Sequence, residues 1–258
     1  MEKNTHMGMN RTGMQMSPMD SGAMQNIDPE LMPIGVTADD ALDEMRSRYI
    51  EESESLGSVP VPATIRGMVN TGAAMMTGND PRLLLDKLGE RLAFERTGTR
   101  LYDALLVKCE ADPSAMVGSM TLDAVLEIRD DELEHFRQLA DTIESLGGDP
   151  TAQTPCADLA GVESMGLMQA LTDPRTSLTQ SLHALLTAEL TDNAGWELLI
   201  ALAESNGKSE MAQEFSVCLQ DERRHLQSVH QWLTEATLGT GALATPAGTM
   251  AAPPAAGI

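Results

Sequence analysis

The sequence predicts an all-α protein built around a four-helix bundle, and three observations lead to this fold class. Four long segments carry apolar residues at i, i+3, i+4 and i+7, which is the spacing of one helix face. No run of residues alternates between apolar and polar side chains as a half-buried strand does. Aromatic residues make up only 3% of the chain, so Leu, Ala, Val, Ile and Met must fill the core, and Leu and Ala favour helix.

The chain begins with an extension in two parts. Residues 1–36 lack apolar periodicity and hold eight of the 18 methionines, so we expect a flexible Met-rich extension there. Residues 37–80 are expected to form a short helical extension, with one helix at 37–54 that starts after Thr37 and a second at about 63–76. The methionine run could bind Cu(I) through thioether sulfur. Only His6 accompanies it, so we favour a strap that packs on the bundle or on a partner subunit. The run comprises Met7, Met9, Met14, Met16, Met19 and Met24.

The bundle is expected to occupy residues 81–237. Its four segments run over about residues 81–108, 121–146, 176–205 and 209–237. Short connections rich in Gly, Pro, Asp and Asn join the first segment to the second and the third to the fourth, so each pair forms an antiparallel hairpin. Residues 147–175 lie between the hairpins and are long enough to cross the length of the bundle. The tail, residues 238–258, carries no charge and many Pro, Gly and Ala residues, so we expect it to be flexible.

The charge of the chain excludes several classes of partner. Asp and Glu number 39 against 17 Lys and Arg, for a net charge of -22. Such a field repels phosphate backbones and anionic lipid, so we expect neither nucleic acid nor a membrane as a partner. We find no apolar stretch long enough to span a membrane and no secretory signal, and we expect a cytoplasmic protein. Three widely spaced cysteines without a C-x-x-C pair fit reduced thiols.

The second and fourth segments each contain the motif D-E-x-x-H. It appears as Asp131-Glu132 with His135 and again as Asp221-Glu222 with His225. Glu and His at i and i+3 project from one helix face, so a carboxylate oxygen and an imidazole nitrogen can meet one metal ion. One copy would be weak evidence, because such pairs are common on charged helix surfaces. Two copies on two helices of one bundle indicate a metal centre with ligands from both sides.

The first and third segments supply the carboxylates that such a centre lacks. Glu95 and Glu189 each interrupt an apolar stripe, where a carboxylate would be costly to bury without a compensating cation. Glu95 lies 37 residues before Glu132, and Glu189 lies 33 residues before Glu222, which suits the up-and-back path of a hairpin. Aromatic residues follow both glutamates seven positions later, as Tyr102 and Trp196. The two hairpins therefore look like duplicates related by a pseudo-two-fold axis.

This pattern resembles the ferritin-like di-iron carboxylate superfamily, and its ligand set is most similar to bacterioferritins and rubrerythrins. The resemblance covers residues 81–237 and implies two bound iron ions, with two manganese ions as the alternative. It also implies that Asp131 and Asp221 lie in the bundle interior and accept the imidazole N–H groups, and that Tyr102 has a redox or supporting role beside the metals. The implied metal ligands are Glu95, Glu132, His135, Glu189, Glu222 and His225. Unlike typical rubrerythrins, this chain contains no rubredoxin module.

Several neighbours of these residues have two interpretations. Asp192 could add a carboxylate to the centre, but its short reach favours a solvated or supporting position. Gly98 either leaves space for a small oxidant or permits close helix packing. Tyr102 and Trp196 are favoured as core residues over redox relays, and Cys218 as a small buried hydrophobe.

The predicted function is that of a dinuclear metal carboxylate protein that reacts with O2 or hydrogen peroxide. It would be a metal-dependent oxidoreductase of the ferroxidase or peroxidase type that oxidises Fe(II) or detoxifies peroxide and so counters oxidative stress. A dimanganese catalase is one alternative, since the ligands also suit manganese. An iron-storage or metal-buffering protein without a separate enzymatic role is another. We expect a homo-oligomer in the form of a dimer.

Overall fold

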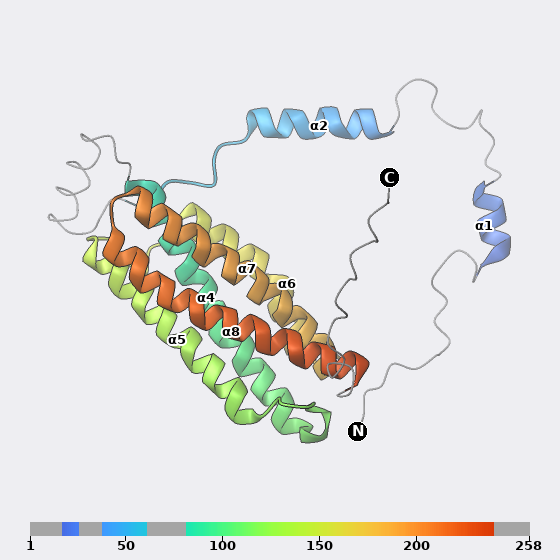
Figure 1. The fold of residues 1–258 in the computed structure, drawn as a ribbon. Coiled ribbons are helices and arrows are strands. Elements are labelled where there is room, and N and C mark those ends of the chain that lie inside the picture. The colour runs from blue at the N-terminus through green and yellow to red at the C-terminus, as the bar shows by residue number, and fades with distance from the viewer. Residues whose placement is uncertain (1–16, 26–37, 61–80, 240–258) are drawn as a thin grey trace, which may run out of the picture. The chain divides into compact units, whose positions relative to one another are not determined.

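The computed structural model describes residues 17–25, 38–60 and 81–239, which fall into two units. One unit comprises residues 4–57, and the other contains residues 58–258. All regular structure in the described residues is helical (Figure 1), and this confirms the predicted all-α class. None of the helices in these residues is long and apolar enough to cross a membrane.

The N-terminal unit contains two helices, α1 (Pro18–Gln25) and α2 (Ala38–Glu52). Helix α2 agrees with the helix predicted at residues 37–54, and i,i+3 and i,i+4 ion pairs such as Arg46–Asp43 support it. Helix α1 was not predicted. Ser17 precedes it and donates a hydrogen bond to Asp20 in its first turn, a local interaction that an analysis of apolar periodicity does not detect. The helix predicted at about 63–76, most of the methionine run and nearly all of the tail lie outside the described residues.

Four long helices form the central bundle of the larger unit (Figure 1). They are α4 (Pro81–Ala111), α5 (Leu122–Ser145), α7 (Leu178–Ser205) and α8 (Ser209–Leu238). Helices α4 and α5 pack against each other as one hairpin, and α7 and α8 as the other. Local signals set their ends. The Thr121 side chain accepts a hydrogen bond from the Ala124 N–H, Ser177 and Gln180 form a capping box, and Gly207 ends α7 with φ of 69°.

The crossover contains a fifth helix that the sequence analysis missed, α6 (Pro155–Thr172). The Thr154 side chain caps it, and Pro155 occupies its first position. Helix α6 packs against α4 and α7. Its buried face consists mainly of small residues such as Ala160 and Ser164, and apolar residues lie on its outer face as well. The contrast between its faces is therefore too weak for the apolar pattern to mark it as an amphipathic helix.

The core consists of two apolar clusters, and the chain order of their members places them at opposite ends of the bundle. One cluster is built around Tyr102, Leu105 and Leu182, and the other around Leu88, Trp196 and Phe215. On α5, α7 and α8, polar residues with almost no exposed surface lie between the stretches that enter the two clusters, and on α4 the buried Arg91 and Glu95 flank the point where one stretch ends and the other begins. The predicted ligands belong to this middle layer.

Candidate metal centre

The four long helices bring all six predicted metal ligands together in the middle layer. Helices α4 and α7 contribute Glu95 and Glu189, while α5 and α8 contribute one Glu and one His each. None of the six is more than 3% exposed. Together with Asp192, their potential ligand atoms form three overlapping groups, and within each group all atoms lie within 4.8 Å of one another. The first group is Glu132, Glu189, Glu222 and His225, the second is Glu95, His135 and Glu222, and the third is Glu95, Glu132, Asp192 and Glu222.

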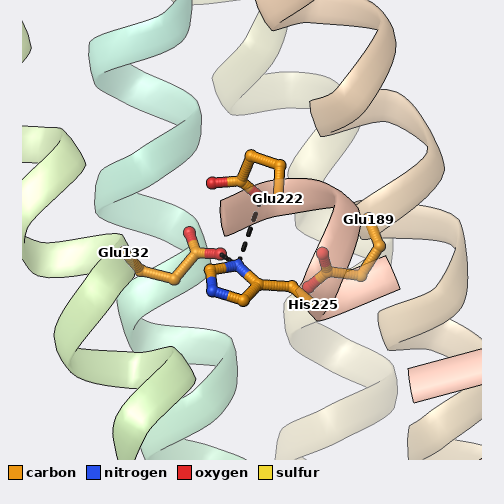
Figure 2. Close-up of side chains that lie close together, drawn as sticks. All are labelled: Glu132, Glu189, Glu222 and His225. Atoms are coloured by element: carbon orange, nitrogen blue, oxygen red, sulfur yellow. Dashed lines mark hydrogen bonds and ion pairs between the residues drawn. The ribbon is translucent and has the colours of Figure 1, made fainter. Parts of the chain in front are cut away.

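Figure 2 shows the first of these groups. The carboxylates of Glu132 and Glu222 approach the His225 ring, whose Nδ1 atom lies 3.6 Å from Glu132 Oε1 and 3.3 Å from Glu222 Oε2. In the second group, His135 Nδ1 lies 2.6 Å from Glu222 Oε1 and 3.8 Å from Glu95 Oε2. The Glu222 carboxylate therefore lies close to both histidines, as expected for a residue between two metal positions.

The buried carboxylates have chemical properties that fit a pair of divalent cations. Both oxygens of Glu95, and one oxygen each of Glu132 and Glu189, accept no hydrogen bond from any described residue. A buried carboxylate without a partner costs free energy unless a cation or a proton neutralises it. Carboxylate oxygen and imidazole nitrogen together suit iron and manganese. The residues present thus fit the metals that the family resemblance implies.

The pKa values of the clustered side chains indicate how their charges would be balanced without a cation. Burial alone would lower the pKa of His135, but the nearby carboxylates of Glu222 and Glu95 raise that pKa to about 11. Burial would raise the pKa of Glu222, but the two imidazoles lower it to about 2. Burial and the charge of Glu222 raise the pKa of Glu189 to about 8. Metal ions would therefore compete with protons for these side chains.

Asp131 and Asp221 contact the histidines in a crossed arrangement. Asp131 Oδ2 lies 3.1 Å from Nε2 of His225, and Asp221 Oδ2 lies 3.6 Å from Nε2 of His135. The aspartate of each motif therefore faces the histidine of the other motif, which links α5 to α8. Both aspartates are partly exposed, with 32% and 28% of their side chains accessible, so the expectation that they lie in the interior was wrong. Their charges face imidazole edges that point outward from the centre.

Tyr102 and Gly98 of α4 both contact the predicted ligands. The buried Tyr102 hydroxyl donates a hydrogen bond to Glu189 Oε1, and burial together with the Glu189 charge raises its pKa. A Cβ atom added to Gly98 would lie 2.0 Å from Glu132 Oε2. The space beside Gly98 is thus taken by the Glu132 carboxylate. Trp196, at the position equivalent to Tyr102, lies edge-on to the His135 ring with centroids 5.6 Å apart.

Sequence reasoning missed a buried ion pair at the edge of the centre. Arg91 is 2% exposed, and its Nη1 atom lies 3.1 Å from Asp192 Oδ1. Asp192 is also only 2% exposed, so of the two positions favoured for it the solvated one was wrong, whereas the supporting one stays a prediction. Asn193 was missed too. Its Nδ2 atom donates hydrogen bonds of 3.0 Å to the carbonyls of Glu189 and Glu222, which joins α7 to α8. The one available signal for Arg91 was its place in the apolar stripe of α4, four residues before Glu95.

The fold and the centre define a helical-bundle protein with a buried carboxylate–histidine cluster suited to metal ions. A family model described as a ferritin-like domain matches residues 123–238, which extend from α5 to α8. This match supports the ferritin-like superfamily that the sequence resemblance implied. Comparisons with curated proteins and with solved structures gave no match.

Proposed function

We propose that the centre holds two iron ions and that the protein is an oxidoreductase that reacts with O2 or hydrogen peroxide, oxidising Fe(II) or detoxifying peroxide. The observation that carries this proposal is the pair of buried ligand groups that share Glu222. Glu189 and His225 belong to one group, and Glu95 and His135 to the other. The ferritin-like match over α5–α8 supports the same function.

Each residue of the centre has a role in this proposal. Glu189 and His225 would hold one ion and Glu95 and His135 the other, with Glu132 and Glu222 between them. The iron pair would supply two electrons to the oxidant. Four buried glutamates would stabilise the ferric state of bound iron, because their negative charge is poorly screened in the interior. The partly exposed aspartates Asp131 and Asp221 hold the imidazoles in the tautomer that leaves Nδ1 free for a metal.

The Tyr102 hydroxyl has a positioning role in this proposal. Its hydrogen bond fixes one oxygen of Glu189 and leaves the other, which accepts no hydrogen bond from a described residue, available to a cation. The raised pKa of Tyr102 keeps its proton on the phenol oxygen at neutral pH. Tyr102 therefore orients a ligand without adding negative charge to the centre.

Anaerobic addition of Fe(II) to the metal-free protein tests the proposal. We expect uptake of two ions per chain, followed by near-ultraviolet ferric absorption and consumption of the oxidant when O2 or peroxide is added. Glu222→Gln should abolish the uptake of the pair, because both ligand groups use Glu222. Glu134→Gln is the matched control, since Glu134 is an exposed glutamate on α5. A wild-type protein that takes up no Fe(II), or that leaves bound Fe(II) reduced in the presence of both oxidants, would contradict the proposal.

Two further measurements separate the proposed function from its alternatives. Metal analysis of protein from its native host should find iron. Manganese together with O2 release from peroxide would instead identify a catalase. Light scattering should find a homodimer, the oligomer that we propose, whereas a closed shell of many subunits would favour storage of iron.

A further inference from the structure

We infer that Arg91 makes the two metal positions unequal, so that the position of Glu189 and His225 fills before the position of Glu95 and His135. This inference rests on the proposed dinuclear site and adds an order of filling to it. It assigns to Arg91 and Asp192 a positioning role that involves no direct bond to a metal.

Arg91 is held firmly beside one half of the centre. Its Nε atom lies 3.6 Å from Glu95 Oε1, and its Nη1 atom donates a 3.2 Å hydrogen bond to the Asp192 carbonyl in addition to its ion pair with the Asp192 carboxylate. The guanidinium carbon lies 4.4 Å from the centroid of the Phe94 ring. A Cβ atom added to Gly195 would lie 1.8 Å from Nη1. The guanidinium therefore occupies the space beside α7 that a side chain at Gly195 would fill.

The internal duplication shows that the ion pair occurs in one half of the centre only. When Glu95 is aligned with Glu189, Arg91 corresponds to Leu185, and Asp192 corresponds to Gly98. The ligand group that includes Asp192 contains Glu95 but neither Glu189 nor His225. Both members of the pair therefore act on the Glu95 side.

The charges on the two sides predict different affinities for a cation. Arginine stays protonated at every physiological pH, so a cation bound by Glu95 has a fixed positive charge close to it. That repulsion is weakly screened in the interior, and Arg91 also attracts the carboxylate that the cation needs. Glu189 has the neutral Tyr102 hydroxyl as its neighbour instead. Asp192 offsets part of the Arg91 charge. Removal of Arg91 should therefore raise the metal affinity of the Glu95 position, and removal of the Asp192 charge should lower it.

Stepwise anaerobic addition of Co(II) to metal-free protein with 15N-labelled histidine tests the order of filling. The signals of His135 and His225 can be assigned with His135→Gln. We expect the His225 signals to respond first, and calorimetry should resolve two steps whose Kd values differ by about tenfold or more. This readout does not depend on any enzymatic activity.

Two variants of the ion pair should shift the second step in opposite directions. Arg91→Leu introduces the residue found at the equivalent position of the other half, and it should tighten the second step about tenfold because it removes the positive charge. Asp192→Asn is nearly isosteric and should weaken the same step, because it leaves the Arg91 charge without its partner. If Arg91→Leu does not fold without metal, Asp192→Asn and the wild-type order still test the inference.

Arg96→Leu is the matched control, because it removes the same charge from an exposed position next to Glu95. Solvent and salt screen that charge, so both Kd values should stay within about twofold of wild type. Three outcomes would overturn this inference but leave the proposed dinuclear site unaffected. They are simultaneous filling in the wild type, a first response from His135, and a second Kd that is unchanged in both ion-pair variants. A wild-type protein that takes up no Co(II) would overturn the proposed dinuclear site, and the inference with it.

Discussion

Gly98 has no side chain, and this leaves the space that one carboxylate of the centre occupies. Because a Cβ atom would lie 2.0 Å from Glu132 Oε2, Gly98→Ala should push Glu132 away from the position that it shares with Glu222 and His225. We expect metal affinity to fall roughly 10- to 100-fold, as for other losses of residues that hold a ligand in place. Calorimetry with Fe(II) or Co(II) measures the change.

The matched control for this substitution is Gly161→Ala on α6. No atom lies within 4 Å of a Cβ atom at Gly161, so this change should leave metal affinity unaltered and stabilise the fold by roughly 0.5–1 kcal/mol. If Gly98→Ala bound metal as tightly as Gly161→Ala does, the proposed positioning role of Gly98 would be wrong.

The pKa values of individual residues in the cluster predict how metal binding depends on pH. The pKa of His135, about 11, and the raised pKa of His225 keep both imidazoles protonated at pH 7, whereas a metal requires them neutral. Metal uptake at pH 7 should therefore release about one proton per imidazole. Glu189, with a pKa of about 8, also gains a proton as the pH falls below that value.

A pH-sensitive dye in weakly buffered solution should detect the released protons as metal is added. Since protons compete with the metal, affinity should decrease as the pH is lowered from 8 to 6. His183→Gln is a suitable control, because His183 is exposed and lies outside the ligand groups of the described residues. Uptake without net proton release would contradict the assigned protonation.

At the scale of elements, α6 serves as a brace for α4 and supplies none of the predicted ligands. The Thr154 hydroxyl accepts a hydrogen bond from the Ala157 N–H and donates one to the Asp86 carbonyl of α4, both at 3.3 Å. Thr154→Ala should cost about 1 kcal/mol of stability, which is typical for the loss of an N-cap. Urea denaturation measures this loss. Metal affinity should change little.

The control for Thr154 is Thr172→Ala at the other end of α6. Thr172 is exposed, and its hydroxyl bonds only within the helix, to the Met168 carbonyl. We expect a change within about 0.5 kcal/mol there. Equal losses from the two substitutions would show that α6 is not anchored at Thr154.

The same elements show what a sequence can predict about this fold. The four long helices were predicted because their periodicity and turn signals are local, and so were the two D-E-x-x-H motifs. Helix α6 was missed because its packing against α4 needs small residues more than an amphipathic stripe. The Arg91–Asp192 pair was missed for a different reason. Its members are 101 residues apart, and their contact follows from the way the two hairpins pack, which the spacing within each hairpin does not specify.

At the scale of the whole molecule, the centre interrupts the core between its two apolar clusters. The bundle therefore gains little hydrophobic stabilisation in its middle layer, where buried charges replace apolar contacts. Metal ions would stabilise the folded state by binding it in preference to the unfolded chain. At a free metal concentration of 100 Kd, each site should add about 2.7 kcal/mol to the free energy of unfolding.

Hydrogen exchange should locate this stabilisation in the middle layer. We expect metal to slow exchange of the amides around Glu132 to His135 on α5 and around Glu222 to His225 on α8, and to raise the Tm. A chelator should reverse both effects. Helix α2 belongs to the other unit and is exposed over residues 40–52, so its exchange should be the same with and without metal and serves as an internal control. Protection confined to the ends of the bundle, or a Tm that metal does not change, would mean that the middle layer is not where the metal binds, because ions held by Glu132 and Glu222 must restrain the two helices that carry them.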